Sequence, residues 1–184
     1  MKITLVTGNK FKADETEEIL NTPIETSDID IPEIQGLDLE KVAHHKLEQA
    51  YKLLKKPVMI DDVSFEVDAW NGFPGPLVKW ILKVSDGPRI MLKMLESEKN
   101  RKAIARLAIG FHDGKKPYLF FGKAIGTIAH EIRGDYGWGW DKVFIPDGYT
   151  ETFAEMDPKI KNSISHRGNA LAKFKDFLKK EYNI

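Results

Sequence analysis

Two long runs of apolar and β-branched residues, 103–111 and 118–129, lie close together in the second half of the sequence. Asp113-Gly114 lies between them, and an Asp-Gly pair between two such runs is a strong signal of a β-hairpin. The sequence therefore predicts two long strands that are neighbours along the chain and are joined by a short turn.

Helix and strand patterns alternate around this hairpin. Helices are predicted over 10–20, 37–55 and 165–182, with two shorter ones within 77–95. Short strands are predicted over 1–6, 57–60 and 143–145. Interleaved strands and helices, without a repeat or a linker, indicate a single α/β domain, 1–184, built on a mixed sheet.

Composition excludes several classes of function. The sequence has 184 residues and no cysteine, so it has no thiol nucleophile, zinc-thiolate site or disulfide. Lys and Arg total 28, as do Asp and Glu, which gives no support for a nucleic-acid-binding or membrane-surface protein. No apolar run approaches the roughly 20 residues of a membrane helix, and the N-terminal pattern indicates a strand rather than a secretory signal. We therefore expect a soluble, cytoplasmic protein.

Thr7-Gly8-Asn9 separates the first predicted strand from the first predicted helix, and Lys10 and Lys12 follow it. The N-terminus of a helix attracts anions through its free backbone N–H groups, and the two lysines add full positive charges. The segment is neither a Walker A loop nor a GxGxxG fingerprint. It is either a phosphate-binding turn or an ordinary strand–helix turn with two solvated lysines.

Asp61 and Asp62 follow the strand predicted over 57–60. If the strand ends there, both carboxylates can reach one cleft, where they must meet water or cations. A Mg²⁺ ion held by one or two carboxylates and by phosphate oxygens would satisfy them. Glu33, in a loop between apolar residues, could add a second ligand from across the cleft. A solvated turn and an ordinary loop glutamate are the alternatives.

The segment 161–167 lies just before the last predicted helix, and Ser163 or Ser165 can cap that helix. His166 and Arg167 would then be cations at the positive end of the helix dipole, which disfavours a purely structural role. An anionic or hydrogen-bond-accepting ligand would resolve the conflict. A surface-exposed pair is the alternative.

Two tryptophans, Trp138 and Trp140, alternate with glycines in the segment 136–141. Aromatic faces of this kind stack well on nucleobases, although they could equally plug a loop into the core. Asp141, which ends the segment, could accept a hydrogen bond from a ring N–H.

The order of these motifs resembles the inosine triphosphate pyrophosphatase family, which acts on purine nucleoside triphosphates with non-standard bases. Six segments carry the resemblance, which covers nearly the whole chain: 7–12 with Glu15, 32–36, 61–62, 72–76 with Lys79 and Trp80, 138–141, and 161–167. Two residues depart from the family pattern. Val63 stands where relatives commonly have Ser or Thr, which removes a hydroxyl contact, and Trp138 stands where many have Phe.

The resemblance implies an elongated two-lobed α/β fold around a long mixed sheet, with the active cleft between the lobes, and a homodimer. It implies hydrolysis of ITP, dITP and XTP to the monophosphate and pyrophosphate with Mg²⁺, or with Mn²⁺ in its place. Asp62 would be the proton acceptor, and Glu33 and Asp62 would hold the metal. The residues implied to contact the substrate are Thr7, Gly8, Asn9, Lys10, Phe11, Lys12, Lys46, Val63, Lys79, Trp138, Gly139, Trp140, Asp141, Lys161, His166 and Arg167.

Two alternatives stay open at this point. A pyrophosphatase of the Maf type acts on modified or pyrimidine nucleotides with a similar fold, and a catalytically silent nucleotide-binding module would share the binding residues. The segment 165–167 and the paired tryptophans favour the purine hydrolase. That interpretation requires Glu33 and Asp62 to lie close together, opposite Lys10 and Lys12.

Overall fold

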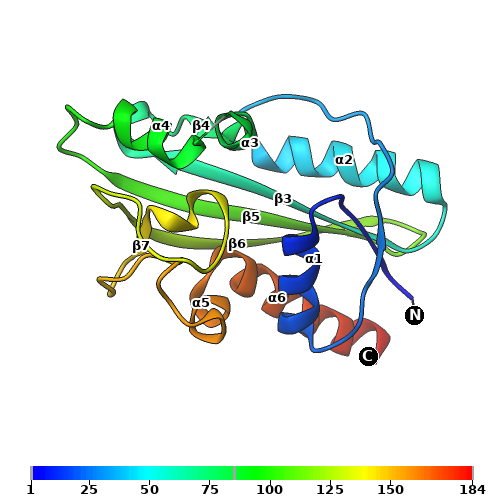
Figure 1. Ribbon diagram of the computed structural model, residues 1–184. Helices are drawn as coiled ribbons and strands as arrows, with labels where there is room; N and C mark the ends of the chain where they lie inside the picture. The colour runs from blue at the N-terminus through cyan, green and yellow to red at the C-terminus, as the bar shows by residue number, and fades with distance from the viewer. Residues whose placement is uncertain (1, 85, 184) are drawn as a thin grey trace.

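The computed structural model describes residues 2–84 and 86–183, which fold around one seven-stranded sheet (Figure 1). The strands lie in the order β2-β1-β3-β5-β6-β7, and β4 pairs with β3 beside this path. Their bounds are β1 Thr4–Val6, β2 Glu25–Ser27, β3 Val58–Val67, β4 Pro74–Gly75, β5 Lys102–His112, β6 Pro117–Ile128 and β7 Phe144–Pro146. β1 is parallel to β2 and β3 and the other pairs are antiparallel, so the predicted mixed sheet is confirmed.

β5 and β6 form the predicted hairpin, and they pair from Lys102 opposite Thr127 to His112 opposite Pro117. Asp113 organises the turn, because its Oδ1 accepts hydrogen bonds from the backbone N–H groups of two following lysines at 2.7 and 2.8 Å. Gly114 has a φ of 98°, a conformation that a side chain would strain. The local Asp-Gly signal therefore fixes the pairing of the two longest described strands.

β3 differs from its prediction. The sequence pattern predicts a strand that ends at residue 60, whereas β3 continues to Val67 and pairs with β5 along its whole length. The prediction is wrong because Asp61, Asp62 and Glu66 interrupt the apolar pattern, and each of these carboxylates is paired with a cation from another element. Since the strand does not end before the aspartates, their side chains point to opposite faces of the sheet.

Two short strands and one α-helix were not predicted: β2, β4 and α5 (Pro158–Ile164). β2 consists of Glu25, Thr26 and Ser27, all polar and at least partly exposed. It is a strand because its backbone pairs in parallel with β1 at the sheet edge, which leaves no mark in the hydrophobic pattern.

Helices cover both faces of the sheet at the end that carries the two termini (Figure 1). α1 (Lys10–Leu20) and α6 (His166–Tyr182) cover one face, with Phe174 in their shared core. α2 (Leu39–Leu54) covers the other face, where its Leu47 packs in a separate core. The helices predicted over 10–20, 37–55 and 165–182 are therefore confirmed, with their ends moved by no more than two residues.

The other end of the sheet carries a second lobe with its own core. α3 (Val78–Lys83), α4 (Gly87–Met94) and the short 3₁₀ helices η1 (Asp68–Trp70) and η2 (Gly139–Lys142) surround it. The largest buried side chains there are Phe65, Trp140, Phe144 and Phe153. β3, β5 and β6 run through both lobes, which gives the elongated two-lobed α/β shape that the resemblance implies (Figure 1).

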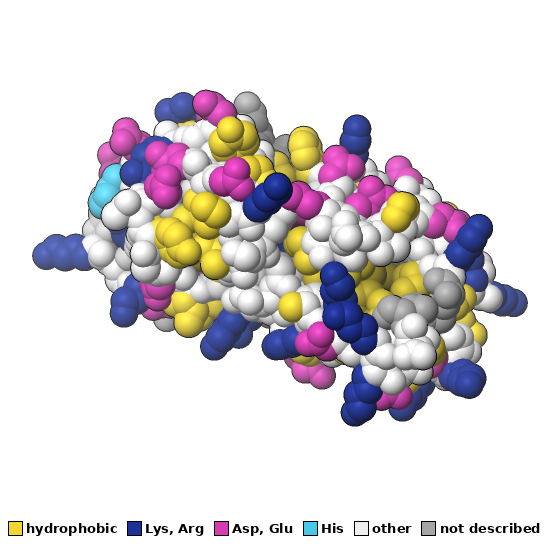
Figure 2. Space-filling view, turned by 90° about the horizontal axis from the view of Figure 1, so that it is seen from below, with side chains coloured by type: hydrophobic (Ala, Val, Ile, Leu, Met, Phe, Trp, Pro, Cys, Tyr) yellow, Lys and Arg dark blue, Asp and Glu magenta, His cyan; other side chains and the backbone are white. Residues whose placement is uncertain are grey.

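Charged side chains of both signs are mixed over the face that Figure 2 shows. Lys and Arg lie beside Asp and Glu across this face, and hydrophobic side chains gather in a few patches between them. None of the helices within the described residues combines the length and the apolar composition needed to cross a membrane.

Candidate active site

Two adjoining cavities, of about 100 and 710 Å³, bring together segments that are far apart in the sequence. They share the side chains of Glu33, Gln35, Lys46 and Lys79. The smaller cavity is also lined by Lys12, Asp62 and Val63, and the larger one by Thr7, Gly8 and Asn9. The strand–helix turn, the loop that contains Glu33, and the middle of β3 therefore meet at one place. Lys10 is exposed at the start of α1.

The turn is fixed by its own side chains. Thr7 Oγ1 accepts a hydrogen bond from the backbone N–H of Asn9 at 3.1 Å. Asn9 caps α1, because its Oδ1 accepts from the backbone N–H groups of Phe11 and Lys12 at 3.0 and 3.4 Å. A side chain at Gly8 would displace the carboxylate of Asp28, since a Cβ there would lie 2.2 Å from one of its oxygens.

Glu33 and Asp62 are held together by one lysine. Lys46 Nζ lies 2.8 Å from Glu33 Oε1 and 2.8 Å from Asp62 Oδ1. Lys79 Nζ binds the second oxygen of Glu33. Partial burial raises the pKa of Glu33, but the positive charges of Lys46 and Lys79 outweigh burial and lower it to about 2. Glu33 is therefore ionised at neutral pH, and the predicted closeness of Glu33 and Asp62 is confirmed.

The second oxygen of Asp62, Oδ2, is buried and has no hydrogen-bond partner among the described residues. An unpaired buried carboxylate oxygen is costly unless a ligand satisfies it. Two neighbouring carboxylates, one with a free oxygen, fit Mg²⁺, which proteins commonly bind through one or two carboxylates while water and phosphate fill the other positions. Among the described residues, no group of three or more His, Asp or Glu side chains could hold a metal by itself.

The side chain of Asp61 faces away from this cluster and is paired with cations that join helices to the sheet. Its side chain is fully buried, and Arg167 Nε and Lys12 Nζ lie 2.8 Å from its two oxygens. Burial raises the pKa of Asp61, but the charges of Arg167 and Lys12 outweigh burial and hold it well below the usual range. Asp61 therefore ties α6 and α1 to the centre of β3.

The structure differs from the prediction that His166 and Arg167 are two cations that require a ligand. His166 is neutral, because burial and the neighbouring charge of Arg167 lower its pKa well below the usual 6.5. Arg167 is a buried cation whose charge is balanced by Asp61 and Glu15. Ser165 caps α6 as predicted, since its Oγ accepts from the backbone N–H of Gly168 at 3.0 Å. His166 Nδ1 is a buried atom without a partner among the described residues.

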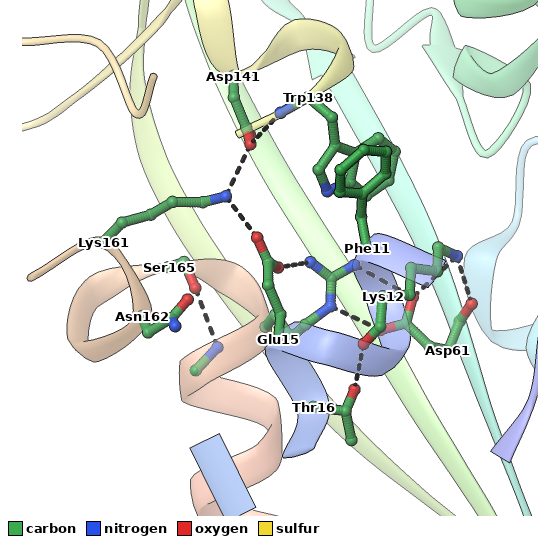
Figure 3. Close-up of polar contacts among 12 residues, drawn as sticks. Phe11, Lys12, Glu15, Thr16, Asp61, Trp138, Asp141, Lys161, Asn162 and Ser165 are labelled. Carbon is green, nitrogen blue, oxygen red and sulfur yellow. Dashed lines mark hydrogen bonds and ion pairs between the residues drawn. The ribbon is translucent and has the colours of Figure 1, made fainter. Parts of the chain in front are cut away.

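A second network joins α1, η2 and α5 (Figure 3). Lys161 Nζ lies 2.7 Å from Glu15 Oε1 and 2.7 Å from Asp141 Oδ2. Burial lowers the pKa of Lys161, but these two carboxylates outweigh burial and raise it. Asp141 Oδ2 also accepts from the backbone N–H of Trp138 at 3.1 Å, so its partners are a lysine and a backbone amide.

The two tryptophans have different environments. Trp140 is 4% exposed and packs in the core of the second lobe, with its ring 4.6 Å from Phe65 and 5.0 Å from His166. Trp138 is partly exposed and lies beside the ring of Phe11 (Figure 3). Of the two tryptophans, therefore, only Trp140 packs its loop into the core. Gly139 begins η2 and lies against Leu82 of α3.

Several residues near these cavities were missed by the sequence analysis. The residues Asp14, Glu18, Tyr136, Met156 and Asn162 line a third cavity of about 170 Å³ together with Phe11, Glu15, Trp138 and Lys161. Phe11, Glu15 and Glu18 are spaced as i, i+4 and i+7 in α1, so the helical period could have indicated a shared face. Asn162 could have been identified only from a tertiary contact, because its Nδ2 donates to Glu18 Oε2 at 3.0 Å.

Known proteins match this chain over nearly its whole length. A family model described as the Ham1 family matches residues 3–177. The chain is 38% identical over 183 residues to a dITP/XTP pyrophosphatase of Methanopyrus kandleri, covering 97% of both chains. It is 40% identical over 186 residues to an inosine triphosphate pyrophosphatase of Batrachochytrium dendrobatidis, covering 99% of this chain and 96% of the relative.

Solved structures give the same result for the fold. The structure of a HAM1 protein from Coxiella burnetii superposes with a TM-score of 0.85 at 28% identity, covering 98% of this chain and 99% of that chain. The Staphylococcus aureus Ham1 protein superposes with a TM-score of 0.83 at 28% identity, covering 98% of this chain and all of that one.

Proposed function

The chain belongs to the Ham1 family, and we propose from this premise that it hydrolyses ITP, dITP and XTP to the monophosphate and pyrophosphate. The observation that carries the proposal is the pairing of Glu33 and Asp62 on Lys46, beside the turn that begins α1. The reaction would remove non-standard purine nucleoside triphosphates from the nucleotide pool.

The lysine-lined cavities are the proposed triphosphate site. A nucleoside triphosphate brings about four negative charges, which the N-terminus of α1 and the ammonium groups of Lys12, Lys46 and Lys79 can offset. Thr7, Gly8 and Asn9 line the larger of these cavities. Lys10, which is exposed beside the turn, supplies a further positive charge near the phosphates.

Glu33 and Asp62 are the proposed ligands of Mg²⁺, or of Mn²⁺ in its place. When bound, such a metal offsets charge on the phosphates and activates water. Lys46 helps to keep Glu33 ionised and holds the two carboxylates close together, because its ammonium contacts both of them. The free oxygen of Asp62 is the atom that is ready to bind a further cation or to accept a proton.

The proposed reaction is in-line attack of water on the α-phosphorus, with pyrophosphate as the leaving group. Asp62 Oδ2 orients the water and accepts its proton, while Oδ1 remains bound to Lys46. General-base catalysis of this kind typically contributes roughly a hundred- to ten-thousand-fold in rate. Lys12 and Lys79 stabilise the negative charge that grows on the pyrophosphate.

Base selection is proposed to depend on hydrogen-bond donors at the start of α6. Hypoxanthine and xanthine have an oxygen at C6, whereas adenine has an amino group. Neutral His166 has one ring N–H that can donate, and Arg167 keeps N–H groups beyond those that bind Asp61 and Glu15. ATP would leave such donors unpaired, which is a strong means of rejection.

The surrounding residues support this base site. Trp138 provides a face for stacking, and Trp140 packs beneath His166. Asp141 and Lys161 hold the loop and α5 together, and the left-handed turn at Gly139 allows the tight start of η2. Val63 lines the smaller cavity through an apolar contact.

Product analysis tests the proposal. The protein incubated with ITP and Mg²⁺ should release IMP and pyrophosphate, whereas IDP and phosphate would contradict it. A turnover panel of ITP, XTP, dTTP and UTP should favour the purines, and preference for the pyrimidines would indicate the Maf type. ITP binding without Mg²⁺-dependent release of pyrophosphate would indicate a silent binding module.

We also propose that the whole chain acts as one pyrophosphatase domain in the cytoplasm, as a homodimer, without a nucleic-acid or membrane partner. The balance of 28 basic and 28 acidic residues supports a small-molecule substrate rather than a polyanion. Sedimentation equilibrium should give twice the mass of one chain, and a single-chain mass at micromolar concentration would contradict the dimer.

A further inference from the structure

Phe11 and Trp138 come from distant parts of the chain and face each other across one end of the site. Their ring centroids are 6.2 Å apart and their planes differ by 18°, so the rings are stacked (Figure 3). Phe11 is nevertheless 57% exposed. A phenylalanine that leaves most of its surface in water contributes little to a core, so packing alone does not explain the position of this ring.

The cavity beside this pair has a different character from the phosphate site. It holds about 170 Å³, and Phe11 and Trp138 line it together with Asp14, Glu15 and Glu18. The acidic side chains outnumber the cation that also lines the cavity, Lys161, which disfavours a phosphate, whereas carboxylates can accept hydrogen bonds from the ring N–H groups of a base.

Consecutive residues of α1 divide the two sites. Lys12 lines the cavity that contains Glu33 and Asp62, whereas Phe11 lines the acidic, aromatic cavity. The backbone N–H groups of both residues are held by Asn9 Oδ1. One capped helical turn therefore presents a lysine side chain, whose ammonium is paired with Asp61, to one cavity and an aromatic ring to the other.

We propose that Phe11 is the second stacking face for the purine base, which is held between Phe11 and Trp138. The inference rests on the proposed function and assigns Phe11, for which the resemblance implies only contact with the substrate, to the base. A base stacked on both rings needs about 3.5 Å on each side. The ring centroids are 6.2 Å apart, which is less than twice this distance, so the two rings must separate before a base can lie between them; Phe11, which is 57% exposed, is the ring with solvent beside it.

The arrangement makes Phe11 a residue for substrate positioning. Because its backbone belongs to the phosphate-binding turn, a nucleotide stacked on the ring has its phosphates directed towards Lys12. Loss of the ring should therefore weaken nucleotide binding and raise KM, with a smaller effect on kcat, whereas binding of phosphates without a base should be unchanged.

Four variants test the proposal: Phe11→Ala, Phe11→Leu, Phe11→Tyr and, as a control, Phe121→Ala. Phe121 is 38% exposed on β6 and belongs to the opposite face of the sheet, the face that Leu119 shares with α2. Binding of IMP is measured by calorimetry without metal, inhibition by inorganic tripolyphosphate is measured with ITP as substrate, and thermal unfolding shows that each variant is folded.

The Ala and Leu variants should bind IMP roughly five- to a hundredfold more weakly, the usual effect of losing one base–aromatic stack. The Tyr variant and the Phe121 control should match the parent, and inhibition by tripolyphosphate should not change. Unaltered IMP binding in Phe11→Ala and Phe11→Leu, or an equal loss of tripolyphosphate inhibition, would overturn the proposal. Failure of the parent protein to release pyrophosphate from ITP would instead refute the proposed function, and the binding comparison would still report on Phe11.

Discussion

Asp61 and Asp62 are adjacent in β3, yet their carboxylates bind different cations on opposite faces of the sheet. Asp61 is fully buried and binds Arg167 and Lys12, whereas Asp62 binds Lys46 and keeps one oxygen free. The strand therefore separates two tasks, since one carboxylate joins the helices to the sheet and the other faces the cavity where the reaction is proposed to occur.

Asn substitutions at these two positions should affect different properties: catalysis at Asp62 and folding stability at Asp61. Asp62→Asn should lower kcat roughly a hundred- to ten-thousand-fold, because the proton acceptor is lost, while the midpoint of thermal unfolding changes little. Asp61→Asn should cost about 3–5 kcal/mol in the free energy of unfolding, because it leaves the buried charge of Arg167 under-compensated. Urea unfolding and pyrophosphate release measure the two effects. Full activity of Asp62→Asn would remove Asp62 from the mechanism.

Glu33 should stabilise the fold at neutral pH and lose this effect in acid. Its pKa is lowered from an ordinary 4.5 to about 2, so the native state binds fewer protons than the unfolded state between these values. The stabilisation is fully present above about pH 4.5 and falls as the pH drops towards 2. Urea unfolding of the parent and of Glu33→Gln should therefore differ at pH 7 and converge as the pH is lowered. A difference that stays constant with pH would contradict the ion-pair assignment.

Lys46 should set the acid limit of activity. Replacement by Met removes one of the two positive charges that lower the pKa of Glu33 and leaves Asp62 beside it without their shared cation, so the pKa of Glu33 should rise. The acid limb of the kcat profile should move to higher pH, and activity at neutral pH should fall. Lys41→Met is the matched control, because Lys41 lies on the same helix with its side chain 80% exposed. An acid limb that is the same in the two variants would show that Lys46 has no such role.

The parts of the fold with local signals could be predicted from the sequence. The hairpin follows from Asp113-Gly114 between two apolar runs, and the start of α1 follows from the Thr7-Gly8-Asn9 turn, in which the structure shows Asn9 to be the helix cap. The full length of β3 could not be predicted, because the carboxylates within this strand are stabilised by cations that belong to other elements. One of these cations, Arg167, is 106 residues away from its partner Asp61 in the sequence.

The sequence predicts which residues belong to the site better than it predicts their burial and charge. The resemblance brings Glu33 and Asp62 together, and the structure confirms their closeness. The neutral state of His166 follows from complete burial between the lobe core and Arg167, which only the tertiary structure determines. The different burial of Trp138 and Trp140 is likewise invisible in a segment where both alternate with glycine.

The neutrality of His166 predicts that base selection does not follow the ordinary titration of histidine. Burial lowers its pKa well below 6.5, and the nearby charges of Arg167, Lys161 and Lys12 act in the same direction against that of Asp61. The ratio of kcat/KM for ITP over ATP should therefore stay constant between about pH 5.5 and 7.5, where an unperturbed histidine would change charge. His166→Ala should lower this ratio roughly ten- to a hundredfold, since a buried donor that rejects the amino group is lost. Because both substrates carry the same triphosphate, its ionisation cancels in the ratio. A ratio that changes with a midpoint near 6.5 in the parent protein would show that His166 titrates normally and selects the base as a cation.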